Sequence, residues 1–142
     1  MYAAVNQYQN MQVTTASPEG ILLMLCDGAV KFSRQALDNM NRGDINGKGI
    51  YIGKALGIVT ELMNTLNHDT GGEIAGNLER LYLYVIGELT GANLKNDAKS
   101  LENAIKIMTN LRDTWTDAVE IVRNERCANK AEHKLQAAGS RR

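Results

Sequence analysis

The sequence predicts an all-α protein, an antiparallel up-and-down four-helix bundle with an N-terminal capping segment. Only one proline, Pro18, occurs in 142 residues, so long stretches lack the strongest helix breaker. Apolar residues recur three and four positions apart in four segments of about 20–28 residues, whereas strand-like alternation is hard to find. Four amphipathic helices joined by short loops pack most readily as such a bundle.

The first helix is predicted from about Pro18 to Asn41. Ser17 can cap its N-terminus, Pro18 is tolerated at the first helical position, and Glu19 suits the positive end of the helix dipole. The segment 42–44 then breaks the helix. The predicted core stripe is Leu22, Leu25, Ala29, Phe32, Ala36 and Met40.

The second helix follows a predicted cap at Asp44 and runs to about Asn67. Its core stripe is Ile45, Ile52, Leu56, Val59, Met63 and Leu66. The turn 68–72 ends this helix.

A third helix is predicted from about Gly72 to Ala92, and residues 93–97 supply the break and the cap for a fourth. The core stripe of the third is Ile74, Leu78, Leu81, Val85, Leu89 and Ala92. The stripe of the fourth is Leu101, Ile105, Met108, Leu111, Trp115, Val119 and Val122.

Small residues form a strip outside the predicted core. Gly49, Gly53 and Gly57 recur every four residues, and each interior glycine costs about 1 kcal/mol against alanine. Such a strip lets another helix approach closely, and that helix is either a bundle neighbour or a partner. The outer face of the third helix, where Arg80 is the only charge, is a candidate docking surface that carries Gly76, Leu83, Tyr84, Gly87 and Gly91. A further off-core stripe on the first helix is Leu23, Val30 and Leu37.

The first eighteen residues contain no Asp, Glu, Lys or Arg. With apolar anchors such as Val5 and Tyr8, this leader is expected to lie against an apolar surface rather than float free. We therefore interpret residues 1–16 as a mobile leader that belongs to a bundle domain of residues 1–125.

Charge is unevenly distributed. Residues 1–125 carry 11 basic and 15 acidic groups, whereas residues 126–142 carry 5 and 1. The C-terminal segment is thus predicted to be a basic, flexible tail. It lacks aromatic stacking residues, which disfavours nucleic-acid binding. No apolar run is long enough to insert into a membrane and no signal-peptide pattern is present, so the cytoplasm is the expected location.

The chemistry of an enzyme is not visible in the sequence. Neither His68 nor His133 has a glutamate three residues before it, as the di-iron sites of helical bundles require. Cys26 and Cys127 form no CxxC or Cys/His cluster, and no glycine-rich phosphate loop is present. We therefore expect no enzymatic activity, no metal and no cofactor.

Three blocks of residues, in order, resemble the FliS family, the cytoplasmic export chaperones of bacterial flagellin. The first block is Thr15-Ala16-Ser17-Pro18-Glu19, Leu23-Met24-Leu25, Asp27-Gly28-Ala29 and Phe32. The second is Gly71-Gly72-Glu73-Ile74-Ala75, Asn77-Leu78, Leu81-Tyr82, Tyr84 and Ala92-Asn93-Leu94-Lys95-Asn96-Asp97. The third is Leu111-Arg112-Asp113, Trp115 and Ala118.

The resemblance implies a chaperone that binds the disordered C-terminal segment of flagellin, prevents its premature polymerisation and supports its delivery to the flagellar export gate. The uncharged leader, the glycine strips and the apolar outer faces agree with a protein that holds a helix in a groove. The alternative is a structural or self-associating bundle, and a homodimer is compatible with the same surfaces.

Partner contacts are predicted on the leader and on the off-core surfaces of the second and third helices. The contact residues are Val5, Tyr8, Tyr51, Ile58, Leu62, Leu83, Tyr84 and Ile86. Clearance for a partner helix is assigned to Gly53, Gly57 and Gly87.

Overall fold

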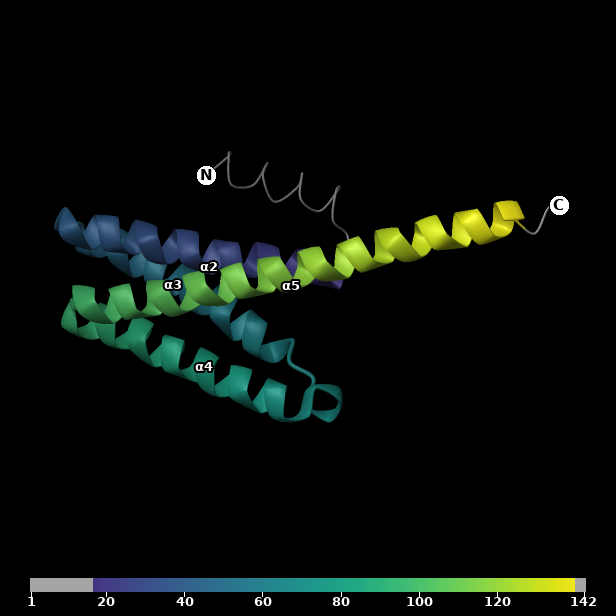
Figure 1. Cartoon of the computed structure of the whole chain (residues 1–142). Helices are drawn as coiled ribbons and strands as arrows, with labels where there is room; N and C mark the ends of the chain where they lie inside the picture. The colour runs from purple at the N-terminus through teal and green to yellow at the C-terminus, as the bar shows by residue number, and fades with distance from the viewer. Residues whose placement is uncertain (1–16, 140–142) are drawn as a thin grey trace. The chain divides into compact units, whose positions relative to one another are not determined.

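The computed structural model describes residues 17–139, which form four helices and no strand (Figure 1). The helices are α2 (Pro18–Asn41), α3 (Ile45–Asn64), α4 (His68–Lys95) and α5 (Ala98–Gly139). The predicted all-α class is therefore confirmed. The predictions for the leader, Val5 and Tyr8 included, lie outside the described residues.

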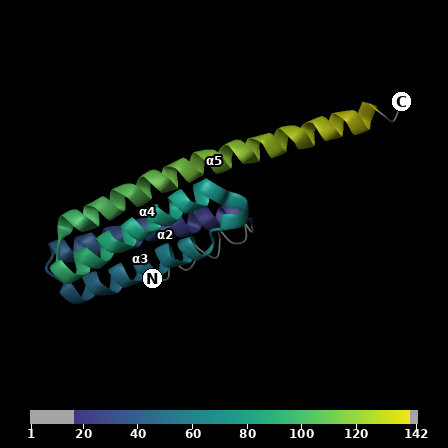
Figure 2. The same cartoon turned by 90° about the horizontal axis from the view of Figure 1, so that it is seen from below.

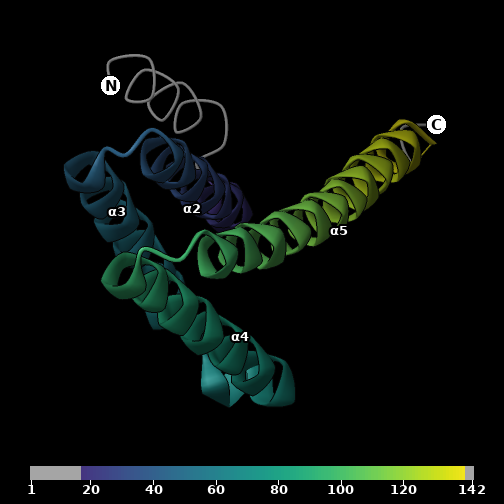
Figure 3. The ribbon, with the colours of Figure 1, turned by 90° about the vertical axis from the view of Figure 1, so that its left-hand side faces the viewer.

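The chain divides into two compact units, one that reaches Arg112 and one that starts at Asp113. In the first unit α2, α3, α4 and the beginning of α5 alternate in direction, and Figures 2 and 3 show them side by side as an antiparallel bundle. Two polar contacts join α5 to its neighbours. Arg112 Nη1 lies 3.4 Å from Asp27 Oδ1 on α2, and Asn103 Nδ2 donates to Glu88 Oε2 on α4 at 3.1 Å.

A side-chain cap begins each helix, at the predicted Ser17 and Asp44, within the predicted segment 93–97, and at Asn67, where no cap was predicted. Ser17 Oγ accepts a hydrogen bond from Gly20 N, and Asp44 Oδ1 accepts one from Gly47 N. Asn67 and Asp97 cap α4 and α5 in the same way. Because each cap satisfies an N–H group that has no partner within its helix, these residues fix where each helix starts.

The core of the first unit is built from apolar side chains of all four helices. The fully buried ones are Cys26, Ala29, Val30 and Ala36 on α2, Ile52, Ala55, Val59 and Leu62 on α3, Val85, Leu89 and Ala92 on α4, and Leu101, Ala104 and Met108 on α5, with Tyr82 almost fully buried. Their spacing of three and four residues is that of one face of each helix.

Four burial predictions are wrong. Val30, which was predicted to lie off the core, is fully buried. Ile45 and Ile74 are each 67% exposed, and Val122 is 40% exposed. Ile45 is the first residue of α3 and precedes the first buried residue of that helix, Lys48. Ile74 follows Gly72, whose φ of 51° and ψ of −121° interrupt the helical backbone of α4, so the periodicity of the later residues does not extend to it.

The second unit is the remainder of α5. The side chains at positions 121–138 are all exposed. The helix runs past residue 125, where the sequence placed the end of the bundle domain, and reaches Gly139. A flexible tail from residue 126 stays a prediction.

Candidate partner-binding surface

The glycine strip of α3 faces open space for most of its length. A Cβ atom built on Gly53 or Gly57 would have no atom within 4 Å. A Cβ on Gly49 would lie 3.8 Å from Asn93 Oδ1 of α4, which is an ordinary contact. In the part of the chain that the structure describes, no bundle helix fills the room beside Gly53 and Gly57.

The outer face of α4 also carries predicted contact residues. Leu83 and Tyr84 are 51% and 52% exposed, and a Cβ on Gly87 would also meet nothing within 4 Å. Ile86 is half-buried. Large apolar side chains thus stand beside a glycine that leaves the helix backbone accessible, an arrangement that suits a docking surface.

A buried lysine fixes the register of α3 against α4. Lys48 is only 3% exposed, and its ammonium donates to Asn93 O at 3.3 Å and to Asn96 Oδ1 at 3.0 Å. Asn96 adopts the left-handed conformation (φ 51°) that ends α4. The start of α3 is thereby tied to the end of α4, as expected for antiparallel neighbours.

This register places one group of predicted residues along the same edge. Gly53 follows Gly49 by one helical turn, and Ile86 precedes Asn93 by two, so each lies on the flank of its helix that contains the contact between Gly49 and Asn93. Leu83 lies one turn before Ile86. Gly57 lies one turn after Gly53, and Gly87 lies one turn after Leu83. Gly53, Gly57, Leu83, Ile86 and Gly87 therefore line the outer edge of the α3–α4 pair, which we call the α3–α4 edge.

The other predicted contact residues lie elsewhere on the bundle. The ring of Tyr51 stacks on Phe32 of α2 with centroids 6.2 Å apart, and Lys54 Nζ lies 5.3 Å from the centre of the Tyr51 ring. Ile58 lies seven residues after Tyr51, on the same side of α3. Tyr84 lies one turn before Glu88, the residue that binds Asn103 of α5, so it belongs to the α5 side of α4.

The prediction for Leu62 is wrong, because this residue lies in the core. It is fully buried, like Ala55 and Val59, from which it is separated by seven and three residues. These spacings place all three on the buried face of α3. A partner cannot reach Leu62 in the folded bundle.

The described residues offer little chemistry of other kinds. Burial raises the pKa of the Cys26 thiol to about 12, so this cysteine is not a nucleophile near neutral pH. No group of three His, Cys, Asp or Glu side chains between residues 17 and 139 could hold a metal ion. None of the described helices is long and apolar enough to cross a membrane.

The family model for the flagellar protein FliS matches residues 1–122. This chain belongs to the FliS family. It is 40% identical over 121 residues to the flagellar secretion chaperone FliSB of Pseudomonas aeruginosa, which covers 81% of this chain and 96% of the relative. It is also 34% identical over 119 residues to the flagellar secretion chaperone FliS of Bacillus subtilis, covering 84% and 88% of the two chains.

The flagellar secretion chaperone of Vibrio cholerae is 38% identical over 104 residues, covering 73% of this chain and 76% of the relative. The match of the FliS model ends at residue 122, whereas α5 continues to Gly139. The chain therefore has a helical segment beyond the part that defines the family.

The predicted contact residues leave out two exposed residues that extend the apolar surface. Ile50 on α3 is 51% exposed and Leu94 on α4 is 80% exposed. Both residues lie opposite the buried face of their helix, and this position would have allowed their exposure to be predicted from the sequence. A helical wheel places Ile50 two residues before the buried Ile52 and Leu94 two after the buried Ala92, on the far side of each helix.

Proposed function

We propose that this FliS-family protein is a cytoplasmic export chaperone that binds the disordered C-terminal segment of flagellin. By holding that segment it prevents premature polymerisation, and it supports delivery of flagellin to the flagellar export gate. The family assignment supports the chaperone role. The choice of client segment and of the gate rests on the family resemblance of the sequence.

The observation that carries the proposal is the open space beside the glycines of α3 and α4. Gly53, Gly57 and Gly87 each weaken the helix that contains them, yet none of them makes room for a neighbour within the described bundle. A partner helix docked on the α3–α4 edge would explain why these glycines are present despite their low helix propensity, because glycine allows two helix backbones to approach closely.

Apolar side chains next to the glycines supply the binding energy. A disordered segment loses conformational entropy when it folds on a partner, so it needs a large apolar contact. Exposed Leu83 and Ile50 and half-buried Ile86 offer such a contact. A client helix that is held here cannot at the same time pack against other flagellin subunits.

The test is calorimetric titration of the full chain with a peptide of the C-terminal segment of its cognate flagellin. We expect Gly53→Leu and Gly87→Leu to weaken binding at least tenfold while circular dichroism shows an intact bundle. Gln35→Leu is the matched control, because it adds a leucine to an exposed position of α2. Full affinity in both glycine variants would show that the α3–α4 edge is not the binding surface.

Light scattering distinguishes the chaperone role from simple binding. Flagellin that polymerises alone should remain monomeric when an equimolar amount of this protein is present. If the protein instead formed a dimer by sedimentation and did not bind the peptide, the self-associating alternative would hold. In that case Gly53→Leu should weaken the dimer.

A further inference from the structure

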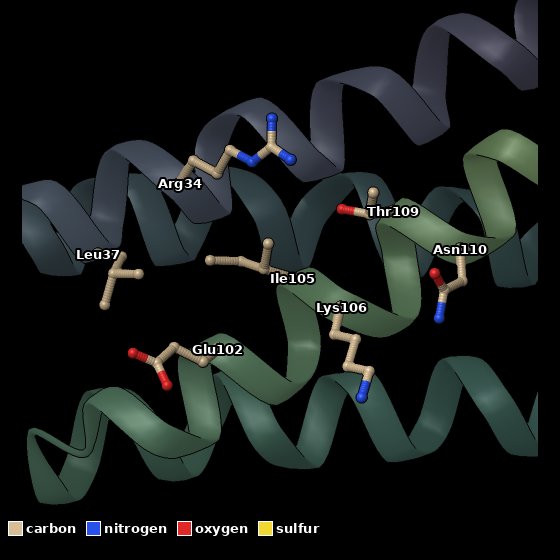
Figure 4. A pocket seen from close by; sticks show the side chains of 7 residues that line it. All are labelled: Arg34, Leu37, Glu102, Ile105, Lys106, Thr109 and Asn110. Atoms are coloured by element: carbon tan, nitrogen blue, oxygen red, sulfur yellow. The ribbon is translucent and has the colours of Figure 1, made fainter.

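A cavity of about 350 Å³ lies between α2 and the first turns of α5. Its lining residues are Arg34 and Leu37 on α2, and Glu102, Ile105, Lys106, Thr109 and Asn110 on α5. Figure 4 shows Leu37 and Ile105 in the space between the two helices, whereas Lys106 extends away from it. The pocket uses no residue of α3 or α4, so it is separate from the α3–α4 edge.

The register of α2 and α5 sets the layout of the pocket. Leu37 lies ten residues after Asp27, and Glu102 lies ten before Arg112, the ion-pair partner of Asp27. Because the helices are antiparallel, Leu37 and Glu102 stand at one level and Arg34 and Ile105 one turn away, about 5 Å along the axis. A cation and an anion therefore mark opposite ends of an apolar floor.

Three polar groups of the pocket have no partner. Among the described residues, the side chains of Arg34 and Glu102 form neither a hydrogen bond nor an ion pair. The hydroxyl oxygen of Thr109 is buried and has no hydrogen bond. Buried polar groups in folded proteins are nearly always paired, so this hydroxyl is available to form a hydrogen bond with a polar group that enters the pocket.

We propose that this pocket binds a partner peptide through one aliphatic side chain with an acidic residue on one flank and a basic residue on the other. The aliphatic side chain packs on Leu37 and Ile105. The acidic flank meets Arg34, the basic flank meets Glu102, and the Thr109 hydroxyl bonds to a polar group of the peptide. The cavity volume lies at the lower end of the range of ligand pockets, so it can hold an aliphatic side chain together with the polar group next to it.

The arrangement is selective because the two rim charges are opposite. Each exposed ion pair is worth about 0.2–1 kcal/mol, which corresponds to a roughly one- to fivefold change in affinity. A peptide with both flanks of one sign gains one pair and meets one repulsion. The proposal does not depend on the binding of flagellin, because it concerns different helices and a different peptide pattern.

The test uses three alanine-based helical peptides with capped termini. Each has a central leucine, a charged residue four positions before it and a charged residue four positions after it. The mixed peptide carries Lys, Leu and Glu, and the two others carry Glu on both flanks or Lys on both flanks. Titration of the full-length protein, followed by the backbone NMR signals of Arg34, Ile105 and Thr109, gives location and affinity together. We expect the mixed peptide to bind two- to fivefold more tightly than either of the others.

Two exposed substitutions should redirect this preference without affecting folding, which circular dichroism checks. Arg34→Glu makes both rim charges acidic and should favour the peptide with two lysines. Glu102→Lys makes both basic and should favour the peptide with two glutamates. A mixed peptide with alanine in place of leucine should not bind. Equal affinity for the three peptides, unchanged preferences in the variants, or no shift at these three signals would each refute the proposal.

Discussion

Replacing Gly53 and Gly57 by alanine should make the protein more stable. Both glycines lie in the interior of α3, and an added Cβ would meet no atom within 4 Å, so neither a clash nor new burial contributes. Helix propensity alone then decides, and it favours alanine by about 0.8–1 kcal/mol per site. The double variant should gain about 1.5–2 kcal/mol in free energy of unfolding.

Urea titration and thermal unfolding measure this gain. For a domain of this size, 1 kcal/mol corresponds to roughly 3–5 °C in Tm. Two other glycines provide controls with the opposite sign. A Cβ on Gly47 would lie 2.5 Å from Asp44 Oδ2 and 2.8 Å from Asn39 Nδ2, and Gly72 has a positive φ of 51°. Gly47→Ala and Gly72→Ala should therefore destabilise the protein.

The same stabilising substitutions should reduce the affinity for a helical client. A methyl group on Gly53 or Gly57 projects into the space in which the partner backbone would lie. A variant that is more stable but binds less well would assign the glycines to binding. If Gly53→Ala and Gly57→Ala lowered the free energy of unfolding, the strip would serve internal packing, and the reasoning from open space would be refuted.

Three further outcomes are expected. Lys48→Met should lose about 1–2 kcal/mol in urea unfolding, because Asn93 O and Asn96 Oδ1 lose their donor, whereas Lys99→Met at an exposed position should change little. Iodoacetamide at pH 8 should modify Cys127 but not Cys26 until urea is added, as mass spectrometry can show. Burial raises the pKa of Cys26 from 9.0 to about 12, so this thiol ionises at a lower pH in the unfolded chain than in the folded one. The free energy of unfolding should therefore be constant below pH 9 with respect to this group and fall as the pH rises from 9 toward 12. Deletion of residues 1–12 should increase dye binding and self-association, and unchanged values in both would contradict the covering role of the leader.

The helix boundaries show how far local sequence signals reach. The prediction for the first helix, Pro18 to Asn41, coincides with α2, because a side-chain cap, a proline and a glycine turn delimit it. The second helix was predicted to reach Asn67, but α3 ends at Asn64. Asn67 instead caps α4, whose first turn starts at His68, four residues before the predicted start. Competing caps in a short connection cannot be ranked from the sequence.

The candidate surface could be predicted only in part. Periodicity identifies the apolar faces of a helix but does not say which of two neighbouring faces is covered. Ile58 and Leu62 lie on one flank of α3, four residues apart, yet the first is half-buried and the second fully buried. That the glycines face open space depends on the position of the neighbouring helices, which spacing does not contain. The α2–α5 pocket combines Leu37 with Ile105, a predicted core residue. It too depends on the relative position of two helices, which the sequence spacing does not contain.

The break at Gly72 has a consequence for how the connection between α3 and α4 can change. In a continuous helix, one inserted residue rotates everything that follows by about 100°. Tyr82, Val85 and Leu89 would then turn out of the core. Because the backbone at Gly72 is not helical, the turn 68–71 is uncoupled from the helix that follows. Insertions or deletions before Gly72 can therefore be absorbed there, and the buried face of α4 keeps its orientation while the connection varies in length.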